Sequence, residues 1–297
     1  MKRDQKLEHA LQKVQKPGRY VGGELNSVVK DPSQVDVRFA FCFPDTYEIG
    51  MSHLGIKILY GAINQVPYFW CERAFAPWVD MEEEMRREGI PLYALESGDP
   101  VNRFDFIGFT LQYELSYTNV LNMLELAGIP LRSADRPDLF NIVVGGGPCA
   151  CNPEPLADFF DLFFLGDGEE VDVEVMELYR QCKKEGKSKL EFLEKAAQIE
   201  GVYVPAFYDV TYHEDGRVKA YTPTHGAPPT VKKRAIVDMD KAYYPKDFVV
   251  PLIDVVHNRI SEEVLRGCIR GCRFCQAGFL YRPYREKSIE TIDGQWR

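Results

Sequence analysis

The sequence predicts an α/β protein built on a doubly wound parallel sheet. Apolar runs with strand character alternate with segments of helical spacing between residues 35 and 183. This alternation is typical of a parallel sheet with helices on both faces. Ligands of such sheets bind beyond the carboxyl ends of the strands. We therefore expect a site among the loops that follow the predicted strands, at 44–53, 110–117, 145–153 and 166–170.

Composition excludes several classes of protein. The 297 residues give room for about two domains. A hydrophobic content of 45% and a charged content of 27% exclude a wholly disordered or collagenous chain. Eight cysteines are too few for a disulfide-stapled miniprotein. The net charge of −9 argues against general nucleic-acid binding, although it leaves room for a local basic site.

No targeting segment is predicted. The first residues contain no apolar stretch of the kind found in secretory signals, and no apolar run approaches the roughly 20 residues that span a bilayer. We therefore expect a cytoplasmic protein with no membrane association, in which thiols stay reduced. Its cysteines should then be core residues, metal ligands or catalytic groups.

The chain begins with a predicted basic helical arm over residues 1–34. Leu7, Leu11 and Val14 form a weak helical stripe, and residues 1–30 contain seven Lys or Arg against three acids. We interpret this segment as a solvated arm in preference to a partner site.

Residues 35–200 are predicted to form the doubly wound domain. The first strand starts at Val35 and ends before Pro44, and the acidic helix at 169–183 closes the series. Between them we expect strands at 69–75, 105–111, 141–144 and 162–165, and helices at 51–63, 78–87 and 115–127.

A β-hairpin and linker are predicted over residues 201–245. Tyr203-Val204, 208–212 and 218–221 have the character of short strands, and several prolines follow them. The final segment, 246–297, contains a predicted strand at 260–265.

Three cysteines lie within eight residues, directly after that last strand. Their spacing is Cys268-x₃-Cys272-x₂-Cys275, which lets a compact loop wrap three thiolates around one iron–sulfur cluster. Such clusters normally take four thiolates, so one iron would stay open to another ligand. Cys272 and Cys275 also fit half of a zinc site, but a second half is missing and the nearest histidine, His257, has no paired partner. Unliganded cysteines are the third interpretation.

Five arginines and no acid lie between residues 266 and 285. They either balance an anionic cluster, meet an acidic substrate, or are simply solvated. The five are Arg266, Arg270, Arg273, Arg282 and Arg285.

Three loops of the domain carry candidate ligand contacts. Gly145-Gly146-Gly147 allows close approach of a ligand to the backbone, or serves as a tight turn. The segment 110–113 offers short polar side chains to a ligand, or caps a helix. For 166–170, which opens a helix with acids, we favour capping over ligand contact.

For two further features of this region we favour interpretations that involve no ligand or metal. Cys149 and Cys151 would point the same way in a strand and could form half of a metal site, but we favour packing or loop roles. Ten acids and no Lys or Arg lie between Pro137 and Tyr179, which we interpret as a solvated helix face.

The cysteine spacing, with Phe274 before the third cysteine, resembles the signature of the radical S-adenosylmethionine superfamily. The resemblance implies that Cys268, Cys272 and Cys275 hold a [4Fe–4S] cluster whose open iron binds S-adenosylmethionine. It implies reductive cleavage of S-adenosylmethionine to a 5′-deoxyadenosyl radical, with Phe274 near the adenine. A reductant such as flavodoxin or ferredoxin is expected from the family, and the substrate is unknown.

Three other blocks are FPDTYEIGMSHLGIKILY, DFIGFTLQYELSYTNVLNML and VVGGGPCACNPEPLADFFDLFFLGDGEEV. They resemble the amino-terminal region of radical S-adenosylmethionine proteins with a cobalamin-binding domain, which implies a flavodoxin-like fold over 35–200. The Asp-x-His-x-x-Gly motif that ligates cobalt is absent around His53. Cobalamin binding without a histidine ligand and loss of the cofactor therefore both remain open. The residues that we expect to contact a bound cobalamin are Ser52, Thr110, Gln112, Gly145, Gly146 and Gly147.

The length sets a further expectation. A partial barrel of about six strand–helix units needs on the order of 180 residues, whereas residues 246–297 suffice for only its start. We therefore expect a fragment that is catalytically inactive alone. The alternative function is a non-catalytic ligand-binding domain with a structural zinc or iron–sulfur loop.

Overall fold

The computed structural model describes residues 5–296; residues 1–4 of the predicted arm and Arg297 lie outside the described residues. A six-stranded sheet with the order β2-β1-β3-β4-β5-β6 forms its centre. The first five strands are parallel, and their order is that of flavodoxin-like folds. The predicted doubly wound α/β class is thus confirmed. The strands are β1 (Val37–Phe43), β2 (Phe69–Phe75), β3 (Phe106–Thr110), β4 (Ile142–Gly146), β5 (Leu162–Phe164) and β6 (Val202–Tyr203).

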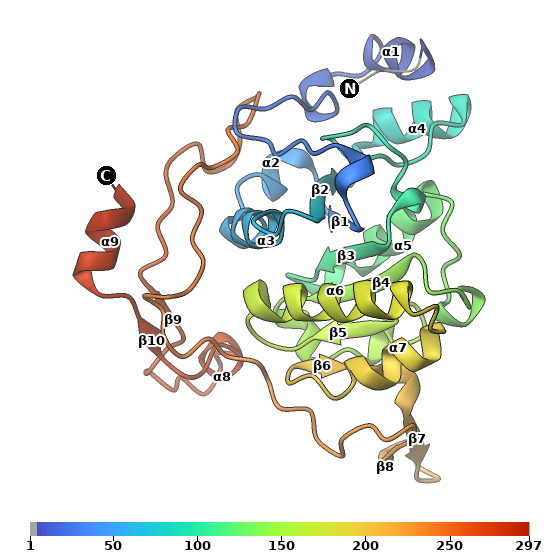
Figure 1. The fold of residues 1–297 in the computed structure, drawn as a ribbon, viewed down its shortest axis with the longest axis vertical. Helices are drawn as coiled ribbons and strands as arrows, with labels where there is room; N and C mark the ends of the chain where they lie inside the picture. Colours follow the sequence, from blue (N-terminus) through green and yellow to red (C-terminus); the bar gives the residue numbers. More distant parts are fainter. Residues whose placement is uncertain (1–4, 297) are drawn as a thin grey trace.

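Helices cover both faces of this sheet (Figure 1). On one face, α3 (Leu54–Asn64) packs beside α6 (Gly168–Lys184), and α7 (Lys189–Ala196) lies against α6. On the other face, α4 (Val79–Glu88) lies beside α5 (Tyr117–Leu126). Right-handed crossovers require this division, because the chain runs outward from β1 to β2 and then back to β3.

Two charged residues of β2 are buried in the domain. The Arg73 guanidinium is 2.6 Å from a Glu96 carboxylate oxygen and 3.1 Å from one of Glu24. Glu72 pairs with Arg38. Because each buried charge has a partner of opposite sign, the strand can lie wholly inside the domain.

The last strand of the sheet corrects one predicted boundary. The sequence placed Tyr203-Val204 with the hairpin, but β6 pairs antiparallel with β5 through Phe163 and Tyr203. Val202 and Tyr203 are buried, so the edge of the sheet takes these two residues from the predicted linker. The helix α7 before them was not predicted, although Ser188 and Glu191 form the capping box that marks its start.

The amino-terminal arm lies against the domain, which corrects its interpretation as a solvated arm. Its helix α1 (Gln5–Leu11) contacts α4, and Leu7, Leu11 and Val14 are buried. The Arg19 guanidinium is 2.8 Å from a Glu48 carboxylate oxygen. Part of the basic charge of the arm is therefore neutralised by the domain.

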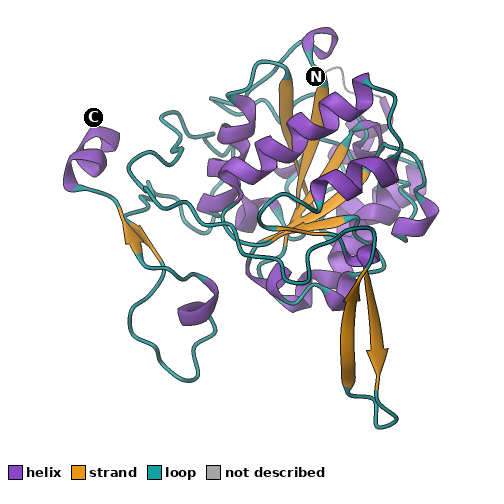
Figure 2. Cartoon of the chain, turned by 60° about the horizontal axis from the view of Figure 1, so that its bottom comes forward, coloured by secondary structure: helices purple, strands orange, loops and turns teal. Residues whose placement is uncertain are grey.

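Beyond the sheet, the chain forms a projecting hairpin and then an extended segment. The hairpin consists of β7 (Tyr208–Tyr212) and β8 (Val218–Pro223), and Figure 2 shows it standing out from the body. An irregular stretch then returns past the sheet. It leads to a short antiparallel ladder and two helices, in the order β9 (Leu265–Arg266), α8 (Ala277–Leu280), β10 (Arg285–Glu286) and α9 (Ile289–Trp296).

The predicted strand at 260–265 was wrong except at its last residue. Ile260 and Val264 are exposed and outside any strand, and only Leu265 belongs to β9. An apolar run forms a strand only where a neighbouring strand completes its hydrogen bonds, and β10 supplies two residues for this. None of the helices within residues 5–296 has the length and apolar character needed to cross a bilayer.

Candidate functional site

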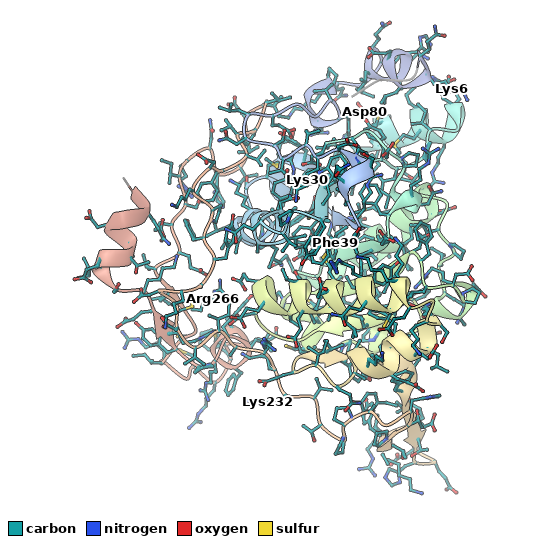
Figure 3. All side chains as sticks on the ribbon, viewed as in Figure 1. Lys6, Lys30, Phe39, Asp80, Lys232 and Arg266 are labelled. Carbon is teal, nitrogen blue, oxygen red and sulfur yellow. The ribbon has the colours of Figure 1, made fainter. Side chains whose placement is uncertain are left out.

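A cavity of about 450 Å³ lies at the carboxyl edge of the parallel strands. Its floor is the sheet face under α3 and α6, including Phe39, Gly108 and Val144. Its outer wall comes from the carboxyl-terminal segment, including Cys268 and Tyr281. Figure 3 shows Phe39 in the middle of the sheet and Arg266 at one end of α6, where that segment meets the domain. The cavity is thus shared between two parts of the chain.

Half of the predicted site residues line this cavity. Four of them come from the domain, Thr110, Gln112, Gly146 and Gly147, and one from the carboxyl-terminal segment, Cys268. Ser52 lies outside the wall: its hydroxyl donates to the Glu48 carbonyl at 2.7 Å and accepts from the His257 backbone N–H at 3.0 Å. The other predicted residues outside the wall are Gly145, Phe274, Cys272 and Cys275.

The three glycines of the loop after β4 have different roles. A Cβ on Gly145 would lie 2.8 Å from the Phe163 ring, so packing requires this glycine. Gly147 has φ +96°, a left-handed backbone that favours glycine. At Gly146 the nearest atom to such a Cβ would be 3.9 Å away, so this position leaves room beside a ligand. The open-backbone interpretation therefore holds for Gly146, and the tight-turn interpretation for Gly147.

A polar edge of the cavity is formed by Thr110, Gln112 and His53. The Gln112 side-chain amide donates to the Thr110 hydroxyl at 2.5 Å. His53 caps α3, since its Nδ1 accepts from the Ile56 backbone N–H at 3.3 Å. Burial lowers the pKa of His53, which favours the neutral ring. Because Nδ1 accepts the bond from Ile56, the proton of the neutral ring lies on Nε2. A ring with both nitrogens so used offers no lone pair to a metal, in agreement with the missing cobalt-ligating motif.

A cluster of acids and arginines fixes the carboxyl-terminal segment to the start of α6. Asp167 binds Arg285, lies 3.3 Å from Arg266, and accepts from the Ile236 backbone N–H at 2.8 Å. Glu169 binds Arg266 as well. We call Asp167, Glu169, Arg266 and Arg285 the acid–arginine cluster. It joins two segments about 100 residues apart, so it places Cys268 at the cavity wall.

This cluster corrects two interpretations of the sequence. The Asp167 side chain makes no capping hydrogen bond to α6, because its oxygens bind Arg285, Arg266 and Ile236. Arg266 and Arg285 are engaged by protein acids, so they are not free to balance a metal cluster or a substrate. The sequence did contain a signal for this contact. Residues 137–179 contain acids and no Lys or Arg, whereas residues 266–285 contain arginines and no acid, so the two segments have complementary charge.

The three clustered cysteines are free thiols. Cys268 and Cys275 are half-buried and Cys272 is exposed, and Phe274 is 93% exposed. Within residues 5–296, no three His, Cys, Asp or Glu side chains come together as a metal site would require. The donor set still suits an iron–sulfur cluster, because three thiols that are free of disulfides lie on one short loop.

The other cysteine pair does not face one way. Cys149 and Cys151 lie in a short 3₁₀ turn over Pro148–Cys151, not in a strand. Cys149 is buried, whereas Cys151 is exposed and touches the cavity. The two thiols therefore do not form the half-site that strand alternation would have produced.

The fold and the sequence place this chain in a known family. Residues 55–205, half of the chain, match the family model described as "Radical SAM proteins, N-terminal", and the chain belongs to this family. The matched residues include the strands and helices around the cavity from α3 to β6. The three clustered cysteines lie beyond them.

Several known proteins are similar over most of the chain. An uncharacterized protein of Methanocaldococcus jannaschii is 27% identical over 261 residues, which cover 85% of this chain and 44% of that protein. Two solved structures share the fold. The radical S-adenosylmethionine methyltransferase TsrM from Kitasatospora setae, with cobalamin and a [4Fe–4S] cluster bound, has a TM-score of 0.50 at 14% identity, covering 87% of this chain and 45% of TsrM.

The second structure is the cobalamin-dependent S-adenosylmethionine radical enzyme OxsB, with aqua-cobalamin and S-adenosylmethionine bound. Its TM-score is 0.51 at 16% identity, covering 87% of this chain and 31% of OxsB. The chain thus spans less than half the length of each of these three proteins.

Proposed function

We propose that this chain is the amino-terminal portion of a radical S-adenosylmethionine enzyme with a cobalamin-binding domain. Cys268, Cys272 and Cys275 would hold a [4Fe–4S] cluster, and the cavity would take the cobalamin. One observation carries the proposal: Cys268 belongs to the wall of the cavity that the sheet edge and Gly146 also line. Cobalamin and cluster would therefore be neighbours, and residues 246–297 would be the start of the catalytic barrel.

The residues of the chain would bind, position and shield these groups. When bound, the cluster supplies an electron to S-adenosylmethionine, and a flavodoxin or ferredoxin would in turn reduce it. Phe39, Gly108 and Val144 give the cavity an apolar floor that excludes water. The acid–arginine cluster holds the cysteine loop against the domain. Thr110 and Gln112 present polar groups at the edge of the cavity.

Anaerobic reconstitution with iron and sulfide tests the cluster. We expect about four irons per chain in the wild type and a spin-resonance spectrum that changes when S-adenosylmethionine is added. Cys268→Ala, Cys272→Ala and Cys275→Ala should each lose the cluster. Cys151→Ala is the matched control, because it alters a thiol of the same cavity wall outside the motif. One tight zinc and no iron would instead support a non-catalytic domain with a structural zinc loop.

Loading with hydroxocobalamin tests the second half of the proposal. The chain should retain the cofactor through gel filtration, with its corrin absorption. Loss of the corrin during filtration would defeat cobalamin binding and leave the cluster assignment standing. We also propose that the 297-residue chain does not cleave S-adenosylmethionine, because it spans only 44% and 45% of two of its relatives. Formation of 5′-deoxyadenosine by the reconstituted chain would contradict this.

A further inference from the structure

The cavity contains a buried carboxyl group that no side chain within residues 5–296 engages. Asp172 lies on α6 and is 5% exposed. Its Oδ2 would be 3.3 Å from a Cβ placed on Gly168, and the Leu59 side chain of α3 approaches the same point to 3.0 Å. Among residues 5–296, the Asp172 carboxyl has neither a hydrogen-bond nor an ion-pair partner, and it faces the cavity.

The other acids of the cavity wall all have cationic partners. Asp167, Glu169 and Glu263 each pair with Arg266. The second cation of the wall, Lys233, donates to a backbone carbonyl of α8 at 2.6 Å. Within the described part of the chain, no cation therefore remains for the carboxyl on α6. This carboxyl is the one acid of the wall without an assigned partner.

Such a group is held in its neutral form. Burial, and then the charge of Glu169, raise the pKa of Asp172 well above its ordinary value. A neutral carboxyl presents an O–H donor beside a C=O acceptor. Its apolar surroundings strengthen any hydrogen bond that it makes and make an unsatisfied one costly. A ligand in the cavity would supply the missing partner.

We propose that Asp172 anchors the ligand of this cavity by paired hydrogen bonds to a neutral group with an acceptor beside a donor. A primary carboxamide and the edge of an aminopurine both have this chemistry. The inference rests on the proposed function, whose two small molecules supply the two sources: cobalamin carries carboxamide side chains, and S-adenosylmethionine carries an aminopurine. Asp172 is then a specificity-determining residue on the α6 side of the cavity.

Three variants of the full chain test this anchor, with hydroxocobalamin and adenosine as separate binding probes. Asp172→Leu removes both hydrogen bonds and keeps the size of the side chain. Asp172→Asn keeps a donor beside an acceptor. Glu174→Leu is the matched control, since Glu174 lies on α6 with its side chain 46% exposed. Binding is measured by equilibrium titration, and thermal unfolding is measured without ligand.

We expect Asp172→Leu to bind one probe at least about tenfold more weakly than the wild type. Without ligand, its Tm should rise by about 2–4 °C, because an unpartnered polar group has been replaced by an apolar one. Asp172→Asn and Glu174→Leu should keep affinities within about threefold of the wild type. The probe that loses affinity identifies the source of the anchored group.

Three results would overturn the anchor. They are unchanged binding of both probes by Asp172→Leu, binding of neither probe by the wild type, and a lower Tm for Asp172→Leu. Iron content separates this outcome from failure of the proposed function. Asp172→Leu should take up as much iron as the wild type. If the wild type takes up no iron, the cluster assignment is wrong, and the anchor is then judged from the binding measurements alone.

Discussion

The acid–arginine cluster predicts that a single charge removed from the domain will loosen the carboxyl-terminal segment. Asp167→Asn keeps the shape of the side chain, and the amide oxygen can still accept from Ile236. It removes the carboxylate that binds Arg285 and faces Arg266. The oxygen that accepts from Ile236 also faces Arg285, so Arg285 keeps a neutral acceptor there beside its backbone carbonyls. The amide nitrogen takes the place of the oxygen that faces Arg266, which keeps Glu169 and Glu263.

The magnitude follows from the burial of these groups. The side chains of Asp167 and Arg285 are 13% and 6% exposed, so solvent screens their attraction only weakly. Hydrogen bonds to charged groups contribute about 1.5–3 kcal/mol each, against about 0.5–1.5 kcal/mol for neutral ones, and both arginine contacts of Asp167 lose their charged acceptor. We expect the free energy of docking to fall by about 2 kcal/mol, which is about a 30-fold change in the population of the undocked segment.

Amide hydrogen exchange measures this change segment by segment. The Lys287 N–H, which donates to the Val264 carbonyl at 3.0 Å, reports on the docked ladder. Exchange at this amide should accelerate about 30-fold in Asp167→Asn, while the amides of β1 and β3 stay protected. Glu170→Gln is the matched control on the same helix turn. Its pair with Arg234 is exposed, so its effect should stay below about 0.5 kcal/mol. Unchanged exchange at Lys287, or an equal loss of protection in β1, would refute the reasoning.

Two further predictions concern the cavity edge. His53→Asn keeps a capping side chain on α3 but cannot titrate. Burial lowers the folded-state pKa of His53, so the folded protein favours the neutral ring. The stability that His53 contributes is therefore present above the ordinary pKa of histidine and is lost as the pH falls below that pKa. Between pH 7 and pH 5, urea unfolding should therefore show a larger loss of stability for the wild type than for the variant; parallel pH profiles would contradict this. Gly145→Ala should cost about 1–3 kcal/mol through contact with Phe163, whereas Gly146→Ala should cost under about 0.5 kcal/mol. Equal unfolding midpoints for the two variants would show that packing does not distinguish these glycines.

Local sequence patterns were sufficient to predict most of the sheet. Strand and helix segments alternate in the sequence, and the resulting crossovers leave few possible topologies. The sequence therefore suffices to place the loops that follow the strands at one edge of the sheet. The expected contacts at Thr110, Gln112 and Gly146 lie at this edge, in the cavity wall.

Contacts between residues that lie far apart in the sequence could not be predicted. Val202 and Tyr203 join the sheet because β5 offers them a free edge. Ile260 has strand character, but no strand of the described residues pairs with it. The local sequence of Asp167 is that of a helix cap, but its side chain pairs with Arg266 and Arg285, about 100 residues away. Asp172 was hidden among ten acids of an expected solvated face, because burial of one of them is a property of the packing of α3 and α6.

The shared construction of the cavity links ligand binding to the docking of the carboxyl-terminal segment. A ligand that touches both Gly146 and Cys268 binds the docked state more tightly than the undocked one, so each molecule bound also favours docking. The coupling is reciprocal: docking of the segment raises ligand affinity by the same factor by which the bound ligand favours docking.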